Sequence, residues 1–93
     1  MSQTETAGKK RVRFEIATEP GHEVFVAGDF NGWKPGEARL KPRGSQGKYT
    51  TTLMLEKGVH EYKFVVDGNW QVDPNNPNRV PNGAGSLNSL LQV

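Results

Sequence analysis

A β-hairpin is the clearest feature of the sequence, in the stretch VHEYKFVVDGNW, residues 59–70. The residues before the turn, VHEYKFVV (59–66), are mostly β-branched or aromatic, which favours a strand. Asp67-Gly68 follows, and this dipeptide is a strong short-range signal for a tight hairpin turn. The residues after it, NWQVD (69–73), then return as a second strand. The stretch therefore predicts a pair of antiparallel strands.

The length of the turn sets the register of this hairpin. If the turn holds only two residues, Val65 faces Trp70 and Lys63 faces Val72, and partners across a strand pair share one face of the sheet. Trp70 and Lys63 then lie side by side outside the core, whereas a slip of one residue would exchange the faces. The other face of the first strand is bulkier and is the predicted core face: Tyr62, Phe64 and Val66.

The rest of the chain also has the pattern of short strands separated by turns. Further strands are predicted at residues 10–17, 23–28, 38–42, 48–56 and 86–93. In 10–17 apolar and charged side chains alternate, so we interpret its basic residues as the solvated face of a half-buried strand. The prolines and charges of 38–42 favour an edge strand, and PNNPNRVPNGAG (74–85) is predicted to be a long loop. Seven or eight short strands without a convincing helix predict an all-β antiparallel sandwich or barrel.

Length and composition fit one small domain. The chain has 93 residues, and we expect a flexible leader at residues 1–9 and one folded domain at residues 10–93. Because there is no cysteine, disulfides and thiolate metal sites are excluded. No stretch approaches the ~20 apolar residues of a membrane span, and the polar start lacks the apolar region of a signal peptide. These features favour a cytoplasmic protein without a membrane partner.

An enzyme is not indicated. The two histidines, His22 in a turn and His60 at the start of a strand, belong to no recognisable catalytic or phosphate-binding motif. Three aspartates stand at turns or strand ends, where Asp is common for backbone reasons: Asp29, Asp67 and Asp73. We interpret these aspartates as structural and the histidines as solvated, with no metal site and no cofactor.

Two tryptophans and two polar side chains suit a neutral, polyhydroxylated ligand. Trp33 lies in a predicted loop and Trp70 on the outer face of the hairpin, near Lys63. Asn88 alternates with Leu87 and Ser89 and should also face away from the core. A flat indole packs against the C–H face of a sugar ring, while lysine and asparagine bond to the hydroxyls at its edge. The competing interpretation is that one or both tryptophans cap the core.

The loop GDFNGW, residues 28–33, contains two aromatic side chains among turn-forming residues. Because loops run over the surface, each ring must either pack back onto the core or stay exposed until a partner covers it. The glycines and Asn31 allow the backbone to turn sharply enough to separate the two rings.

Three segments together resemble the family 48 carbohydrate-binding modules, and in particular the glycogen-binding domain of the AMP-activated protein kinase β subunit. They are GDFNGW (28–33), GVHEYKFVVDGNWQVDPNNP (58–77) and SLNSLLQV (86–93). The resemblance extends from about Val12 to Val93. The combination of the three motifs is specific, whereas each motif alone is a weak signal.

The resemblance implies an immunoglobulin-like, early-set β-sandwich that binds α-1,4-linked glucan such as glycogen, starch or maltooligosaccharide. By matching motif, Trp33 and Trp70 resemble the family's two stacking tryptophans. Phe30 matches a family phenylalanine that packs inward, so Phe30 is predicted to turn inward and anchor the loop, and Trp33 to stay outside and point toward the same groove as Trp70. Lys63 and Asn88 resemble the lysine and asparagine that bond to sugar hydroxyls. The chain departs from the kinase domain at Ala84, about where that domain has a bulky leucine over the sugar chain. It also has Gly32 in place of a second asparagine in the first loop.

Two other functions compete with glucan binding. The first is a protein-interaction module that docks on a glycogen-metabolism enzyme or on a kinase subunit, since domains of this family are often attached to enzymes. The second is nucleic-acid binding through the basic residues of the loop side, which are Lys34, Arg39, Lys41 and Arg43. A net charge of only +2 argues against nucleic acid as a partner.

Overall fold

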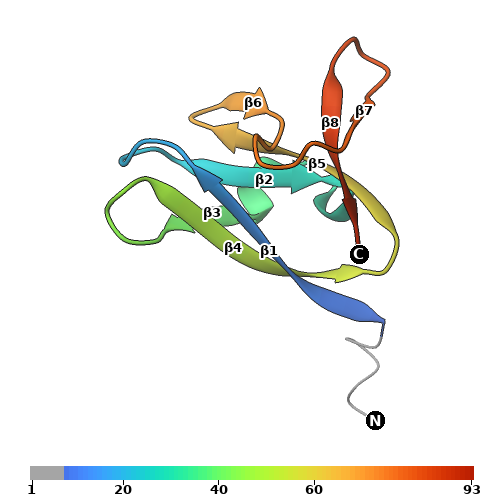
Figure 1. The fold of residues 1–93 in the computed structure, drawn as a ribbon, viewed down its shortest axis with the longest axis horizontal. Coiled ribbons are helices and arrows are strands. Elements are labelled where there is room, and N and C mark those ends of the chain that lie inside the picture. Colours follow the sequence, from blue (N-terminus) through green and yellow to red (C-terminus); the bar gives the residue numbers. More distant parts are fainter. Residues whose placement is uncertain (1–7) are drawn as a thin grey trace.

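The computed structural model describes residues 8–93, which form eight β-strands and two short 3₁₀ turns (Figure 1). The strands are β1 (Lys9–Ala17), β2 (Val24–Gly28), β3 (Arg39–Pro42), β4 (Lys48–Glu56), β5 (Val59–Val66), β6 (Asn69–Gln71), β7 (Arg79–Pro81) and β8 (Leu87–Gln92). The 3₁₀ turns are η2 (Asp29–Asn31) and η3 (Pro35–Glu37). All strand pairs are antiparallel, so the predicted all-β class is confirmed. The leader predicted for residues 1–9 falls almost entirely outside the described residues, and β1 begins at Lys9.

β3 links two groups of strands into one curled, sandwich-like sheet. The strand order is β1-β4-β3-β2-β5-β8-β7, with β6 paired to β5 beside this path. Arg39 and Leu40 pair with β2, whereas Lys41 and Pro42 pair with β4. The prediction that 38–42 is an edge strand is therefore wrong. Composition suggested an edge, but each half of this short strand has one partner, and the strand crosses from one group to the other.

The core lies between these two groups of strands. β1 and β4 contribute Phe14, Ile16, Tyr49 and Leu55, while β2 and β5 contribute Val24, Val26, Tyr62, Phe64 and Val66, all of them buried. The alternation of apolar and charged residues predicted for β1 is confirmed, since Arg11 and Arg13 are exposed. Outer side chains of the sheet are thereby left available for other contacts.

The β5–β6 hairpin has the predicted register. Val65 pairs with Trp70 and Phe64 with Gln71 across the turn at Asp67-Gly68. The pairing of Lys63 with Val72 is not formed, because β6 ends at Gln71. Beyond that point the same edge of β5 pairs with β8, through residues 59–62. Lys63 therefore lies between the part of β5 that pairs with β6 and the part that pairs with β8.

The segment 74–85 contains a strand that composition concealed. β7 forms three pairs with β8, including Val80 with Asn88, so the prediction of an uninterrupted loop is wrong. β7 lies at the edge of the sheet, where Pro81 is tolerated because its missing N–H faces no partner strand. Before β7, the Asn76 amide donates to the Tyr62 hydroxyl over 3.1 Å and to the Leu90 carbonyl over 2.9 Å. These contacts hold the segment against β5 and β8.

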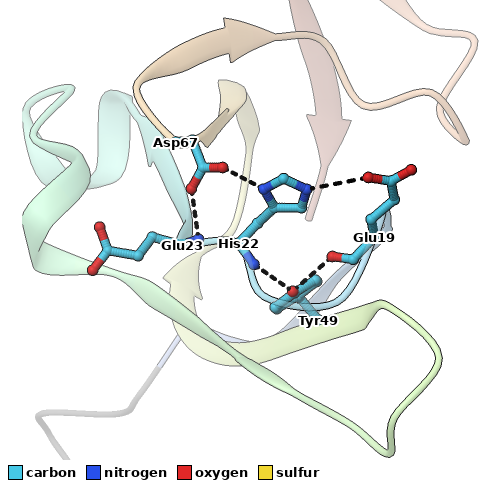
Figure 2. Close-up of polar contacts among 5 residues, drawn as sticks. All are labelled: Glu19, His22, Glu23, Tyr49 and Asp67. Carbon is cyan, nitrogen blue, oxygen red and sulfur yellow. Dashed lines mark hydrogen bonds and ion pairs between the residues drawn. The ribbon is translucent and has the colours of Figure 1, made fainter.

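The β1–β2 loop and the β5–β6 turn are tied together by His22 and Asp67 (Figure 2). The Asp67 carboxylate contacts the His22 ring and accepts the Glu23 backbone N–H over 2.9 Å. The hydrogen bond that the His22 ring donates to the Asp67 carboxylate raises the pKa of His22, and the bond from the Glu23 N–H lowers the pKa of Asp67. The prediction that both histidines are simply solvated is therefore wrong, since His60 also contacts a carboxylate, that of Asp29.

Within residues 8–93 the structure contains no helix long and apolar enough to span a membrane.

Candidate functional site

A cavity of about 400 Å³ opens on the outer face of the sheet, beside β5. Its lining residues are Trp33, Glu61, Lys63, Trp70, Asn82 and Asn88. We call it the tryptophan cavity. All four residues singled out in the sequence line it, although they come from segments as far apart as residues 33 and 88. The competing interpretation is that one or both tryptophans cap the core, but neither belongs to the buried core cluster or to the apolar residues packed against it.

The loop that carries Trp33 is held by its own asparagine. The Gly28 N–H donates to Asn31 Oδ1 over 3.0 Å, and Asn31 Nδ2 donates to the Val26 carbonyl over 3.1 Å. The Trp33 N–H then donates to the Gly28 carbonyl over 2.9 Å. These hydrogen bonds close the loop and hold the backbone of Trp33 in a defined position.

Phe30 and Trp33 leave this loop in different directions, as predicted. The Phe30 ring packs against the core, with its centroid 5.6 Å from that of Phe14. Gly32 and Trp33 both have left-handed backbone conformations, with φ of 66° and 61°. A left-handed conformation costs a non-glycine residue roughly 1–2 kcal/mol, so the folded loop holds Trp33 in a strained conformation. Strain of this kind concentrates at functional sites.

Asp29 joins the loop to β5. Its Oδ2 accepts the Glu61 backbone N–H over 2.9 Å, and its Oδ1 accepts from His60 Nδ1 over 2.9 Å. The other ring nitrogen, His60 Nε2, donates to the Glu56 carbonyl over 2.7 Å. Because both partners of the ring are acceptors, the two bonds together require the doubly protonated imidazolium. Accordingly the pKa of His60 is raised, first by the Glu56 carbonyl and then by Asp29.

Lys63 is held over the cavity by the β7–β8 turn. Its Nζ donates to Ser86 Oγ over 2.9 Å. The turn itself is organised by Asn82, whose Oδ1 accepts the backbone N–H of Ala84 over 2.8 Å and that of Ser86 over 3.2 Å. Asn82 Oδ1 is therefore occupied within the turn. Ala84 is exposed and is not among the residues that line the cavity.

Asn88 faces the cavity but is itself buried, with 7% of its surface exposed. Its Nδ2 donates to Glu61 Oε1 over 2.9 Å. The next residue on β8, Ser89, is fully buried and its Oγ accepts the Asp73 backbone N–H over 2.8 Å. Asp73 Oδ2 in turn accepts from the Tyr62 hydroxyl over 2.7 Å, and burial raises the pKa of Tyr62. This buried network holds β8, and with it Asn88, in a fixed position beside β5.

Trp70 contributes the most exposed surface of the site. It lies on the three-residue strand β6 and is 47% exposed, while its cross-strand partner Val65 is only 4% exposed. A large apolar side chain at this exposure is available to a ligand at little structural cost. The predicted outward position of Trp70 is confirmed.

Two lining residues were missed in the sequence. Glu61 lies two residues before Lys63 on the same strand, so strict alternation places both on one face, and this signal was available. Asn82 lies in a turn between β7 and β8, and since β7 itself was not predicted, no periodicity pointed to Asn82. The three aspartates all accept backbone N–H groups, which supports their structural interpretation. No group of three or more metal-ligating side chains occurs among residues 8–93.

Known proteins match most of the length of this chain. Residues 11–93 match the family model described as the glycogen recognition site of AMP-activated protein kinase. The 5′-AMP-activated protein kinase subunit beta-1 of Rattus norvegicus is 40% identical over 76 residues, which cover 82% of this chain and 26% of the rat protein. The beta-2 subunit of Homo sapiens is also 40% identical, and the match covers 82% of this chain and 27% of that protein. The chain thus spans about a quarter of the length of these relatives.

Proposed function

This chain belongs to the family of the glycogen recognition site of AMP-activated protein kinase, and from that premise we propose that it binds α-1,4-linked glucan without transforming it. Glycogen, starch and maltooligosaccharides are the ligands of this class. The single observation that carries the proposal is the meeting of Trp33 and Trp70 with Lys63 and Asn88 in one open cavity. We further propose that the protein acts in the cytoplasm.

The chemistry of the cavity supports a sugar as the ligand. Two indole rings offer flat apolar surfaces for the C–H faces of successive glucose units. Lys63 Nζ donates hydrogen bonds only, whereas the Asn88 amide has both donors and an acceptor, so together they match the mixed character of sugar hydroxyls. The cavity has no cluster of like charges, and this suits a neutral ligand.

The expected affinity is modest. Covering one face of an indole removes about 100 Å² of apolar surface and contributes about 2.5 kcal/mol. Two platforms give about 5 kcal/mol, since hydrogen bonds and ordering costs roughly offset one another. The dissociation constant for a short oligosaccharide is then roughly 0.1–1 mM. A branched glycogen particle is expected to bind more tightly, because it offers many sites at once.

Affinity electrophoresis in gels that contain glycogen or soluble starch tests the proposal. We expect the wild type to be retarded, and the double variant Trp33→Ala, Trp70→Ala to migrate freely. Phe25→Ala is the matched control, because Phe25 lies on the outer face of β2 and does not line the cavity. Free migration of the wild type, or equal retardation of the double variant, would contradict glucan binding.

A second function is favoured by the relatives themselves, which are subunits of a kinase. We propose as the alternative that the domain docks on a kinase subunit or on an enzyme of glycogen metabolism. Co-purification from native lysate, with and without excess maltooligosaccharide, separates the two functions. A stoichiometric partner that stays bound in excess sugar favours docking, whereas a partner that the sugar releases favours glucan binding.

A further inference from the structure

The tryptophan cavity contains one carboxylate, that of Glu61, among its six lining side chains. The backbone of Glu61 is fixed from both sides. Its N–H donates to Asp29 Oδ2 over 2.9 Å, and its carbonyl oxygen would lie 2.6 Å from a Cβ on Gly28. The side chain is partly buried on the outer face of β5. Glu61 therefore starts from a rigid position and reaches into the cavity rather than into open solvent.

The Glu61 carboxylate fixes the orientation of the Asn88 amide. Among residues 8–93, the bond from Asn88 Nδ2 to Glu61 Oε1 is the one hydrogen bond of the Asn88 side chain. An ionised carboxylate only accepts hydrogen bonds, so the NH₂ of Asn88 must point toward Glu61. The opposite side of the amide, Oδ1, is then the side that faces away from Glu61. Without the carboxylate, either orientation of this amide would be possible.

Glu61 also balances the charge of the cavity. The only other charged residue in the lining is Lys63, two positions along the same strand. One positive and one negative charge leave the cavity without net charge. A glucan that carries phosphate groups would bring its negative charges close to the Glu61 carboxylate, and this repulsion opposes the attraction by Lys63.

We propose that Glu61 determines the specificity of the cavity: it orients Asn88 for a sugar hydroxyl and disfavours phosphate-bearing glucans against uncharged ones. The inference rests on the proposed glucan binding. Glu61 acts on Asn88 as a positioning residue and on the ligand through its charge. These two effects are separable to within about twofold. Glutamine removes the charge and still offers an acceptor to Asn88 Nδ2, but its own NH₂ also permits the reversed amide pair. If both orientations of Asn88 were equally populated, half of the molecules would remain competent and the affinity would fall about twofold. Alanine removes charge and acceptor together.

Calorimetric titrations with maltoheptaose and with phosphate-bearing maltooligosaccharides test both effects. For Glu61→Gln we expect maltoheptaose affinity within about twofold of the wild type, while the affinity ratio shifts toward the phosphate-bearing ligand by about five- to tenfold at low salt. The shift should shrink at high salt, because the site is open to solvent. For Glu61→Ala we expect maltoheptaose affinity to fall about fivefold, the loss of one oriented hydrogen bond.

Glu15→Gln is the matched control, since it removes the same charge from β1, outside the cavity lining. Its ligand ratio should stay within about twofold of the wild type. Thermal unfolding identifies any variant that has lost its fold. If Glu61→Ala does not fold, Glu61→Gln alone tests the inference, because its side chain has nearly the same volume as glutamate. A ratio unchanged in Glu61→Gln, or an Ala variant that binds maltoheptaose like the wild type, overturns the inference. A folded wild type that binds neither ligand overturns the proposed function as well.

Discussion

At Gly28, the start of the Trp33 loop lies close to the backbone of β5. A Cβ at this position would lie 2.5 Å from the Phe30 ring and 2.6 Å from the Glu61 carbonyl oxygen. Its backbone is extended, so the requirement for glycine comes from this close approach alone. The same contact presses the loop onto β5, and the loop carries Trp33. A single residue without a side chain thus helps to set the distance between Trp33 and the rest of the cavity.

Gly28→Ala is predicted to destabilise the protein by about 1–3 kcal/mol, because the backbone carbonyl of Glu61 cannot yield without distorting β5. Glucan affinity should also fall, since the loop must move away from the strand. Urea unfolding followed by tryptophan fluorescence measures the first effect, and titration with maltoheptaose measures the second. Gly36→Ala is the control, because a Cβ there meets nothing within 4 Å. Equal stability of the two variants would contradict the close-approach argument.

At the scale of elements, the loop and β5 are connected through charge. His60 uses both ring nitrogens as donors, toward Asp29 and toward the Glu56 carbonyl. A neutral imidazole has one N–H and can keep only one of these bonds. Asp29 also accepts the Glu61 N–H. The protonation state of His60 therefore affects how the Trp33 loop, which carries Asp29, is attached to β5, which carries Lys63.

The His60 contact predicts a loss of stability with rising pH. Because the pKa of His60 is raised in the folded protein, its contribution is fully present below the unfolded value of about 6.5 and disappears as the pH rises through the folded value. Melting temperatures measured between pH 5 and 9 should fall less for His60→Gln than for the wild type. The same smaller fall is expected for His22→Ala, because the pKa of His22 is also raised in the folded protein. Parallel curves for the wild type and His60→Gln would contradict the prediction.

The contacts of Asp67 predict a loss of stability at low pH. The pKa of Asp67 is lowered, first by the Glu23 N–H and then by His22. Its stabilising contribution is therefore present above the unfolded value of about 3.9 and is lost as the pH falls through the lower, folded value. Asp67→Ala should lower the urea midpoint at pH 6 and flatten its decline between pH 6 and 2.5. The exposed carboxylate of Glu37 provides the control, because Glu37→Gln should leave the decline as steep as in the wild type.

At the scale of the whole molecule, the cavity is assembled from five segments that only the closed fold brings together. Bound glucan should therefore stabilise the folded state and not the unfolded chain. At a maltoheptaose concentration ten times the dissociation constant, we expect about 1.4 kcal/mol of stabilisation. For a domain of this size, the melting temperature should then rise by about 5–10 °C.

Differential scanning fluorimetry measures this rise, and a β-1,4-linked cello-oligosaccharide of equal length is the ligand control. The variant Trp70→Ala should lose most of the shift while keeping a folded baseline, because its side chain is exposed and lies outside the core. A full shift in Trp70→Ala would indicate that the sugar binds elsewhere.

The sequence by itself predicted seven of the eight strands found in residues 8–93, and the buried faces of the strongest ones. Period-two alternation predicted the core-facing side of β1 and β5. The hairpin register followed once a two-residue turn at Asp67-Gly68 was assumed, and the structure has that register. These features need no knowledge of distant contacts, and each is confirmed in the folded chain.

Only the tertiary structure decided how distant segments meet. β3 became a link between two groups of strands, and 79–81 became a strand because β8 was available to pair with it. The histidines gained carboxylate partners from loops 31 and 45 residues away. Asn82 joined the cavity for the same reason, since it lies in the turn between β7 and β8. Strand pairing and charge contacts of this kind depend on which segments become neighbours when the chain folds. The composition of one segment does not indicate which distant segment will lie beside it.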